Sequence, residues 1–504
     1  MRRNPLTFCV AVIVSIILVL QWLPMVQANW SIRDDYDFVA AMNDHGRLSF
    51  HDFLERITPK GMGLGSEVNR PVYEFVHDSW MLLIGNNLPL WQSAKIVTFG
   101  MVIALFVYFF ALATDLMAAI ILTCFVGFQS TWADVVPRAN AELFGVLGLV
   151  IYAIGNLHLL RTPRDALSGS GRKSSWMHLL LVAVGGCIAV ASKENFCFTI
   201  MASSACLLLF SLFLDKKPLV AAAQIFPLLM AFIFCGLIAY GMKANGGKAL
   251  YGQTFEPLSI LATGLTRCLS GGIISWMPAC LGVLYAVVFL LRRNHSHLWL
   301  ALYEWGLLGI VFLNFGFYTG LPLFGRYFIP ENFVPSFAVL PLLAEIRVRG
   351  RWVQLLGYGL LVALCLPVAI SGFRFNYKWS ADYRDETERF AAKLRKVMET
   401  ISKDPHKPLV FESYAVSDYE PLVSVQTYLN YYGASNPEFV KISYSESGLK
   451  DSHDLYVYSL VQDLTSPGSQ FKPIAALPSS DYFVITFSSP QPQVQAITNF
   501  AGQE

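Results

Sequence analysis

Two adjacent carboxylates, Asp34 and Asp35, follow the first strongly apolar segment of the chain. Carboxylates that stand side by side raise each other's pKa or hold a cation between them. Either condition suits a general base that takes a proton from a hydroxyl group. We therefore interpret Asp34 and Asp35 as candidate catalytic residues, whereas the nearby Asp37 has the character of a solvated loop residue.

A second group of polar residues crowds a short connection between two apolar runs, where Asp134, Arg138, Asn140 and Glu142 occur together. Glu142 opens the following helix, where a carboxylate also compensates the helix dipole, so both a structural and a catalytic role stand open for it. Arginine is a typical partner of phosphate and anionic headgroups. Arg138 is thus a candidate phosphate-binding residue.

A third turn, again between two apolar runs, contains Lys193 and Glu194. Charged side chains this deep in apolar sequence are costly unless they are paired or line a wet cavity, and they often mark functional sites. The structural alternative is a salt-bridged helix hairpin. We interpret Lys193 as a phosphate contact and Glu194 as its supporting residue.

Two further cations complete the candidate phosphate-binding set. Arg326 and Tyr327 lie in an irregular Gly- and Pro-punctuated stretch that ends at Pro330, and Arg70 precedes Pro71 in the long first loop. Arg326 beside an aromatic ring fits an anion contact. The alternative is an ordinary interfacial arginine with a tyrosine of the aromatic belt.

The elements that must position these residues are membrane-spanning helices. Hydrophobic residues make up 55% of the 504 residues, charged residues only 14%, and the mean hydropathy is +0.48, which is unsuitable for a soluble surface. The net charge of +2 provides no broad basic field, which argues against a nucleic-acid partner. The chain is therefore predicted to be an α-helical polytopic membrane protein.

About eleven transmembrane helices are predicted, because each crossing needs roughly 20 mostly apolar residues. They cover residues 8–25, 92–114, 117–134, 142–160, 176–191, 196–214, 218–241, 271–291, 297–315, 331–346 and 353–372. Cleavage of the first segment as a signal peptide is an alternative, since Arg2 and Arg3 precede it and Val26-Gln27-Ala28 follows it.

Basic residues occur in every second connection, which the positive-inside rule assigns to the cytoplasm. The amino terminus is then inside and the carboxyl terminus outside, and the candidate site residues all lie on outward connections. The basic positions are Arg2, Arg3, Arg161, Arg164, Arg172, Lys173, Lys216, Lys217, Arg292, Arg293, Arg347, Arg349 and Arg351.

Two domains are predicted: a transmembrane region, residues 1–372, whose first outward loop covers 29–91, and a small soluble α/β domain outside the membrane, residues 373–504. In the second domain, 408–411 and 482–487 have the pattern of short buried strands, and 382–401 and 418–432 that of helices. The nine cysteines all precede residue 373, so no disulfide framework holds this domain.

Together these short motifs resemble the GT-C superfamily of glycosyltransferases, polytopic enzymes that use a sugar carried on a polyprenyl phosphate. The chain is similar to the protein mannosyltransferase and aminoarabinose transferase branches and to bacterial O-antigen glucosyltransferases. The resemblance covers the membrane region and lies in Asp34-Asp35, Arg138 with Glu142, Ser192-Lys193-Glu194, and Gly325-Arg326-Tyr327 before Pro330.

The resemblance implies an inverting transfer. Asp34 or Asp35 would deprotonate an acceptor hydroxyl as it attacks the anomeric carbon, while Arg138, Lys193 and Arg326 stabilise the leaving lipid phosphate. The implied partners are a polyprenyl-phosphate-linked sugar, a glycan, lipid or protein acceptor, and membrane lipid. The implied location is a bacterial inner membrane, with the site facing the periplasm.

The sequence requires no cofactor, although Asp34, Asp35 and Glu142 together would suit a hard divalent metal ion. Two other functions remain open. An O-antigen polymerase or ligase would favour a large outward loop late in the chain, whereas the longest outward loop here comes first. A transporter or flippase would place charges near the bilayer midplane and often carries paired repeats, whereas the charges here gather at helix ends.

Overall fold

The computed structural model describes residues 5–30, 35, 38–39, 41–42, 45–58, 70–161, 172–213, 217–244, 257–292, 296–318, 325–347, 350–443, 472–473, 481–488 and 491–497. The chain divides into two compact units. The first contains Met1–Leu23, Glu55–Val76 and Ala94–Trp379, and the second contains Pro24–Leu54, His77–Ser93 and Ser380–Glu504.

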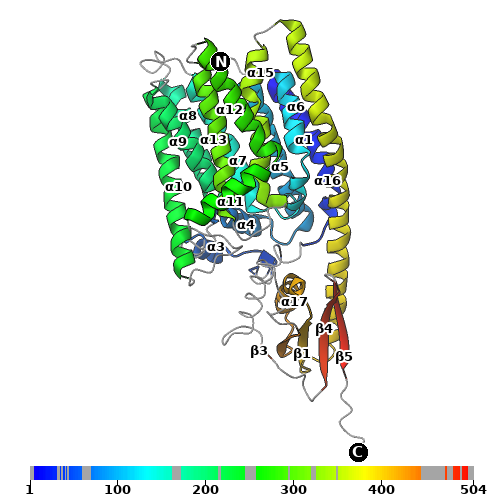
Figure 1. Ribbon diagram of the computed structural model, residues 1–504. Coiled ribbons are helices and arrows are strands. Elements are labelled where there is room, and N and C mark those ends of the chain that lie inside the picture. The colour runs from blue at the N-terminus through cyan, green and yellow to red at the C-terminus, as the bar shows by residue number, and fades with distance from the viewer. Residues whose placement is uncertain are drawn as a thin grey trace, which may run out of the picture. The chain divides into compact units, whose positions relative to one another are not determined.

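The first unit is a bundle of helices in which α7, α8, α9, α10, α12 and α13 run side by side (Figure 1). Several elements, including α3, α4 and α16, contribute residues to both units. The helices up to the start of the second unit's sheet are α1 Pro5–Val19, η1 Leu20–Gln27, α3 Phe50–Arg56, α4 Pro71–Leu83, α5 Leu88–Ala113, α6 Leu116–Gly127, η2 Ser130–Asp134, α7 Ala141–Arg161, α8 Arg172–Val190, α9 Glu194–Phe213, α10 Pro218–Ala244, α11 Pro257–Ser270, α12 Ile273–Arg292, α13 Ser296–Phe317, η5 Gly325–Phe328, η6 Glu331–Phe333, α14 Val334–Ala338, α15 Leu340–Arg347 and α16 Arg351–Ile401.

The protein is an integral membrane protein with a mostly helical fold. Among the described residues six helices are long and apolar enough to cross a bilayer, and α11 with α12 forms a seventh candidate that is bent by 87°. Leu116–Gly127, Trp176–Val190 and Tyr303–Phe317 are shorter apolar helices. Each predicted segment except 331–346 overlaps one of these helices, although the bounds differ, and the total of eleven crossings stays a prediction.

The segment 331–346, predicted as one continuous span, is instead divided into η6, α14 and α15. Pro335 and Pro341 lie within it, and proline lacks the N–H that a helix interior needs. The structure also places α11 in the stretch between Lys243 and Gly271 that was predicted as a loop.

Helices α7 and α8 cross with their backbones in close contact because glycines line the crossing. A Cβ atom on Gly148 would lie 2.3 Å from the backbone nitrogen of Ala189, and one on Gly185 would lie 2.3 Å from the backbone nitrogen of Tyr152. Small residues permit this approach between membrane helices, where tight packing replaces the hydrophobic effect as the driving force. The crossing fixes α7 relative to the turn that follows α8.

Buried amides join the first helical segment to α16. Gln21 donates from Nε2 to the carbonyl of Gly127 at 3.0 Å, and its Oε1 accepts from Nδ2 of Asn376 at 2.9 Å. Asn376 also donates to the carbonyl of Gln129 at 3.2 Å. Both amide side chains are fully buried. Because lipid offers no hydrogen-bond partners, these contacts satisfy polar groups that would otherwise be costly in the membrane.

Basic side chains gather at the ends of α5 and α7 that lie away from the turn before α7. Arg161 donates to the carbonyl of Ala113 at 3.2 Å, Arg347 donates to the carbonyl of Thr114, and Lys217 donates to the carbonyl of Leu160. Cations are favourable at helix carboxyl ends, where carbonyl groups lack helical partners. The bundle therefore carries these predicted cytoplasmic cations at one end.

The second unit contains a five-stranded sheet in the order β3-β2-β1-β4-β5. Strand β1 pairs in parallel with β2 and with β4, and β2 pairs in parallel with β3, whereas β5 is antiparallel to β4. Apolar residues of α17 and of the last turns of α16 pack on one face of the sheet. Strands β1 and β4 and helix α17 lie where the sequence predicts strands and a helix, whereas residues 382–401 are the end of α16 and not a separate helix. The elements are β1 Leu409–Ser413, η7 Val416–Asp418, α17 Tyr419–Tyr431, β2 Glu438–Ile442, β3 Lys472–Pro473, β4 Tyr482–Ser488 and β5 Gln491–Ile497.

Candidate functional site

Three connections of the first unit bring their charged side chains together. Glu142 lies in the first turn of α7, Lys193 and Glu194 lie where α8 gives way to α9, and Arg326 lies in η5. Arg70, directly before α4, joins the same group through Glu194. We call Arg70, Glu142, Lys193, Glu194 and Arg326 the ion cluster.

Glu142 is the centre of the first half of the ion cluster. Its carboxylate accepts a hydrogen bond from Nζ of Lys193, and Oε1 of Glu142 lies 3.8 Å from Nε of Arg326. The side chains of Glu142 and Lys193 are each only 2% exposed, whereas that of Arg326 is 24% exposed. Arg326 therefore presents part of its guanidinium group to solvent while it faces Glu142.

Glu194 holds the second half. Arg70 contacts both carboxylate oxygens, from Nε at 3.3 Å and from Nη2 at 3.2 Å, in the two-pronged arrangement that suits a guanidinium group. Tyr318 adds a longer hydrogen bond of 3.5 Å to the same carboxylate. Glu194 is buried, whereas the Arg70 side chain is 18% exposed.

An aromatic ring packs against two of the cations. The ring of Tyr327 lies 4.9 Å from Nζ of Lys193 and 5.4 Å from Cζ of Arg326. A cation over a ring face is attracted by its quadrupole, by roughly 0.5–2 kcal/mol depending on desolvation. Tyr327 therefore orients Arg326 and Lys193, as well as lining the cluster.

Backbone contacts hold the three connections in register. The backbone N–H of Val72, in the first turn of α4, donates to the carbonyl of Ala191 at 3.0 Å. The side chain of Asn195 donates to the carbonyl of Ile329, which ties the start of α9 to the segment that carries Arg326. The ion cluster thus rests on helix ends that are fastened to one another.

The ion cluster has more positive than negative groups, three cations against two carboxylates among its five members, or a formal charge of +1. Burial lowers the pKa of Lys193, and the neighbouring Arg70 and Arg326 lower it further, whereas Glu142 and Glu194 raise it. Lys193 consequently depends on these carboxylates to stay charged. The surplus of one positive charge suits an added anion.

Arg138 and Lys95 lie near the same end of α7. Arg138 is half-buried in the turn four residues before Glu142. Lys95, in α5, is fully buried and donates to the carbonyl of Pro137 at 2.8 Å. Asn140 closes the turn by donating to the carbonyl of Asp134 at 2.7 Å. Lys95 therefore holds the turn that carries Arg138.

Asp35 belongs to the second unit, and its partner in the predicted acidic pair, Asp34, lies outside the described residues. Asp35 is helical and fully buried. Its segment is anchored by aromatic packing, in which the ring of Phe38 stacks on that of His77 at 4.5 Å and the rings of Trp30 and Trp91 meet at 5.4 Å. The catalytic role of the two aspartates stays a prediction.

A metal ion bound at Glu142 does not fit the residues around it, because the carboxylate faces two cations. Across the part of the chain that the structure describes, no three His, Cys, Asp or Glu side chains are grouped closely enough to hold a metal ion.

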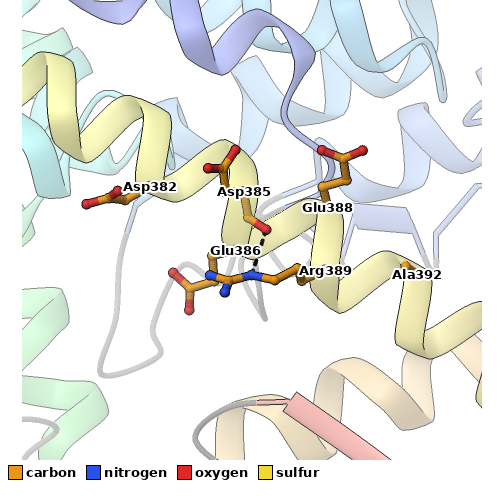
Figure 2. A pocket seen from close by; sticks show the side chains of 6 residues that line it. All are labelled: Asp382, Asp385, Glu386, Glu388, Arg389 and Ala392. Atoms are coloured by element: carbon orange, nitrogen blue, oxygen red, sulfur yellow. Dashed lines mark hydrogen bonds between the residues drawn. The ribbon is translucent and has the colours of Figure 1, made fainter.

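The second unit has an acidic hollow along α16 (Figure 2). Arg389 crosses it and donates from Nε to the carbonyl of Asp385 at 3.1 Å. Every lining residue comes from one helix, and solvated carboxylates on a helix face are ordinary surface chemistry, so we assign no ligand to it. The lining residues are Asp382, Asp385, Glu386, Glu388, Arg389 and Ala392.

Sequence reasoning missed several buried ionisable residues of the first unit, among them Lys95, Glu304 and Glu331. Lys95 lies in a largely apolar stretch of sequence, which is itself a signal, because a charge in a membrane helix is costly. Glu331 was absorbed into the predicted span 331–346, yet it is fully buried in η6.

Comparisons with known proteins were made on both sequence and structure. No family model and no curated protein sequence matches the chain. Among solved structures, it is similar to the Archaeoglobus fulgidus oligosaccharyltransferase tethered with an acceptor peptide, at 12% identity and a TM-score of 0.47 over 84% of this chain, which spans only 63% of that protein's length.

The chain is also similar to ArnT from Cupriavidus metallidurans. The apo structure matches at 11% identity and a TM-score of 0.48 over 94% of this chain and 92% of that one. The structure bound to undecaprenyl phosphate matches at 12% identity and a TM-score of 0.47 over 98% of both chains. These neighbours are GT-C glycosyltransferases, the superfamily that the sequence resembles. At such TM-scores the likeness does not decide function, which must follow from the side chains.

Proposed function

We propose that this protein is an inverting glycosyltransferase that moves a sugar from a polyprenyl-phosphate donor to a glycan, lipid or protein acceptor at the outer face of a bacterial inner membrane. The observation that carries the proposal is the ion cluster. It joins three helix connections, has a surplus positive charge, and exposes parts of Arg70 and Arg326.

The proposed reaction requires positive charge beside the leaving group, and the ion cluster would supply it. The acceptor oxygen forms a bond to the anomeric carbon, the bond from that carbon to the phosphate oxygen breaks, and the lipid phosphate leaves with the bonding electrons. Arg70, Lys193 and Arg326 would stabilise the negative charge that grows on this oxygen, with Arg138 as a further predicted contact. The proton of the acceptor hydroxyl would pass to Asp34 or Asp35.

The sequence left a catalytic role open for Glu142, but its surroundings make it unsuitable as the proton acceptor. A carboxylate held by Lys193 and facing Arg326 is a poor base, because both cations stabilise its charged form. We assign Glu142 to positioning these two cations, and Glu194 to positioning Arg70.

The test is binding of undecaprenyl phosphate to the purified full chain, followed by turnover of a radiolabelled polyprenyl-phosphate sugar. Arg326→Gln should weaken binding by roughly 10- to 100-fold, the usual range for a hydrogen bond to a charged group. Arg326→Lys should recover only part of it, because lysine cannot form a two-pronged contact. Arg389→Gln, an exposed arginine of α16, is the matched control and should bind like the wild type.

Unchanged binding in Arg70→Gln, Lys193→Met and Arg326→Gln alike would remove the phosphate role from the cluster. Movement of the intact lipid-linked sugar across vesicle membranes without any transfer would instead support a flippase.

A further inference from the structure

Glu331 is a fully buried carboxyl group next to the ion cluster, and the mechanism above does not use it. It lies in η6, outside every candidate membrane-spanning helix of the described chain. Within the described residues, neither of its carboxylate oxygens accepts a hydrogen bond of normal geometry. An ionised carboxylate is costly in a buried position without well-aligned donors.

The described surroundings of Glu331 supply few donors: its own backbone N–H and the amide of Asn314 act on the carboxyl group, but neither forms a hydrogen bond of normal geometry with it. The side-chain carbonyl oxygens of Asn195 and Asn314 are also buried without a donor from the described residues. The side-chain amide of Asn314 donates one hydrogen bond to the hydroxyl of Thr199 at 3.1 Å. This hydroxyl in turn donates to the backbone carbonyl of Asn195 at 3.3 Å. Among the described residues of this pocket, buried acceptor oxygens therefore outnumber the donors that reach them.

The charged side chain that interacts with Glu331 is Lys193, whose ammonium group favours the ionised form of the carboxyl group. The elements that pack on η6 are α13, α14, α5 and η2. Helix α14 has no ionisable residue, and the charged residues of the others, Glu304, Lys95 and Asp134, are not among the groups that shift the pKa of Glu331. The preceding η5 carries Arg326 and Tyr327. A metal cation in this pocket would stand in the field of Lys193. A proton on Glu331 supplies a donor without that repulsion.

We propose that Glu331 is a positioning residue of the anion site that carries a proton at neutral pH and thereby preserves the positive surplus of the ion cluster. Ionisation would add a third carboxylate beside Lys193, bring the formal charge from +1 to zero, and compete with Glu142 for the ammonium group. The inference rests on the proposed function, since it concerns the same phosphate-binding cluster.

The pKa of Glu331 agrees with this geometry. Burial raises it to about 8, although the backbone N–H of Glu331, the amide of Asn314 and the charge of Lys193 oppose the rise. The proton is therefore present at neutral pH and leaves in the mildly alkaline range. Because loss of the proton removes positive surplus, anion binding should weaken as pH rises through about 8.

The experiment measures undecaprenyl phosphate binding to the purified full chain between pH 6 and 9, for wild type, Glu331→Gln and the exposed control Glu399→Gln. Glutamine is neutral at every pH, so the affinity ratio of Glu331→Gln to wild type should be near one at pH 6 and rise to about tenfold at pH 9, the limit for one linked proton at one pH unit above its pKa. Titration of the lipid phosphate, which is the same ligand in both measurements, cancels in this ratio. Glu399→Gln should follow wild type throughout.

Infrared difference spectra give a second readout. The wild-type minus Glu331→Gln spectrum should contain the carbonyl band of a protonated carboxylic acid at pH 6, and the band should fade towards pH 9. If Glu331→Gln does not fold, Glu331→Met replaces it as the neutral variant in both measurements.

An affinity ratio that stays constant with pH, or a missing carboxylic acid band, would overturn the proposal. So would binding that follows the concentration of Na⁺ or Mg²⁺ at fixed ionic strength and loses this response in Glu331→Gln, since the pocket would then hold a metal cation. A wild type that binds no undecaprenyl phosphate at any pH would contradict the proposed function instead, and the infrared band would still report the proton.

Discussion

Among the members of the ion cluster, Lys193 is the residue whose substitution should lower the stability of the protein most. Its ammonium group is buried and contacts Glu142, so Lys193→Met removes the closest cation from a buried carboxylate and leaves Arg326 at 3.8 Å. Breaking one side of a buried ion pair costs about 3–5 kcal/mol. We expect a clear fall in the thermal unfolding temperature of Lys193→Met in detergent, measured by differential scanning fluorimetry.

The double variant Glu142→Gln/Lys193→Met separates stability from function. Replacing both charges of a buried pair is often nearly neutral, so most of the lost stability should return. Donor binding should stay weak, because the cation remains absent. Equal destabilisation of the single and double variants would show that packing, and not charge, sets the cost.

Asp35 is the described member of the predicted catalytic pair. Asn is nearly isosteric with Asp but cannot accept the proton, so Asp35→Asn should keep unfolding temperature and donor binding near wild type. Transfer of radiolabelled sugar should fall by roughly 10²–10⁴-fold if Asp35 is the base, and Asp34→Asn should fall less. Asp382→Asn, exposed on α16, is the control.

If both aspartate variants retain transfer while Glu142→Gln abolishes it, the base has been assigned to the wrong carboxylate. Full activity in all three would favour a transporter over a transferase.

Polar residues in apolar sequence predicted much of the ion cluster, because bilayer chemistry makes each such residue expensive. Arg70, Glu142, Lys193, Glu194 and Arg326 were all singled out by this reasoning. Their pairing was not predictable, since it depends on how three distant connections meet. Glu331 escaped notice because a single carboxylate at the edge of an apolar run looks like a helix end.

At the scale of the helices, the glycine crossing of α7 and α8 controls the cluster from a distance. The Cβ of Gly148→Ala would stand 2.7 Å from the carbonyl oxygen of Gly185, so the helices must separate. Overpacking of this kind typically costs about 1–3 kcal/mol. We expect a lower unfolding temperature together with weaker donor binding, because α7 carries Glu142 and α8 leads into Lys193.

Gly236→Ala in α10 is the matched control for this crossing. No described atom lies within 4 Å of the Cβ that it adds. Alanine is the better helix former by about 1 kcal/mol, so this variant should be as stable as wild type or slightly more so. Equal losses in the two variants would mean that the close approach at Gly148 is not the cause.

Hydropathy located most helices but not their ends or breaks. The 51 residues of α16 continue through the polar positions where a span and a separate helix were predicted, because residues beyond the apolar part still favour a helix. Helix α11 was missed because it is amphipathic, not uniformly apolar. In both cases packing in three dimensions, which one sequence does not display, decides the outcome.

For the whole molecule, the arrangement of charges predicts its orientation in the membrane. Arg161, Lys217 and Arg347 gather at helix carboxyl ends, away from the ion cluster of the same unit. Reporter fusions after Lys173, Lys217, Arg293 and Arg351 should report the cytoplasm, and a fusion after Lys378 should report the outside. A cytoplasmic reporter after Lys378 would place every candidate site residue in the wrong compartment.

The hydrogen bond between Gln21 and Asn376 has a consequence for biogenesis, since the two residues are 355 positions apart. At about 5–20 residues per second, a ribosome needs roughly 20–70 s to make the stretch between them. Throughout that time the first helix carries an amide oxygen whose final partner has not yet been synthesised, and lipid offers no substitute. The helix that enters the membrane first is therefore among the last to settle, and a chain truncated before Asn376 should remain with the insertion machinery as an unassembled intermediate.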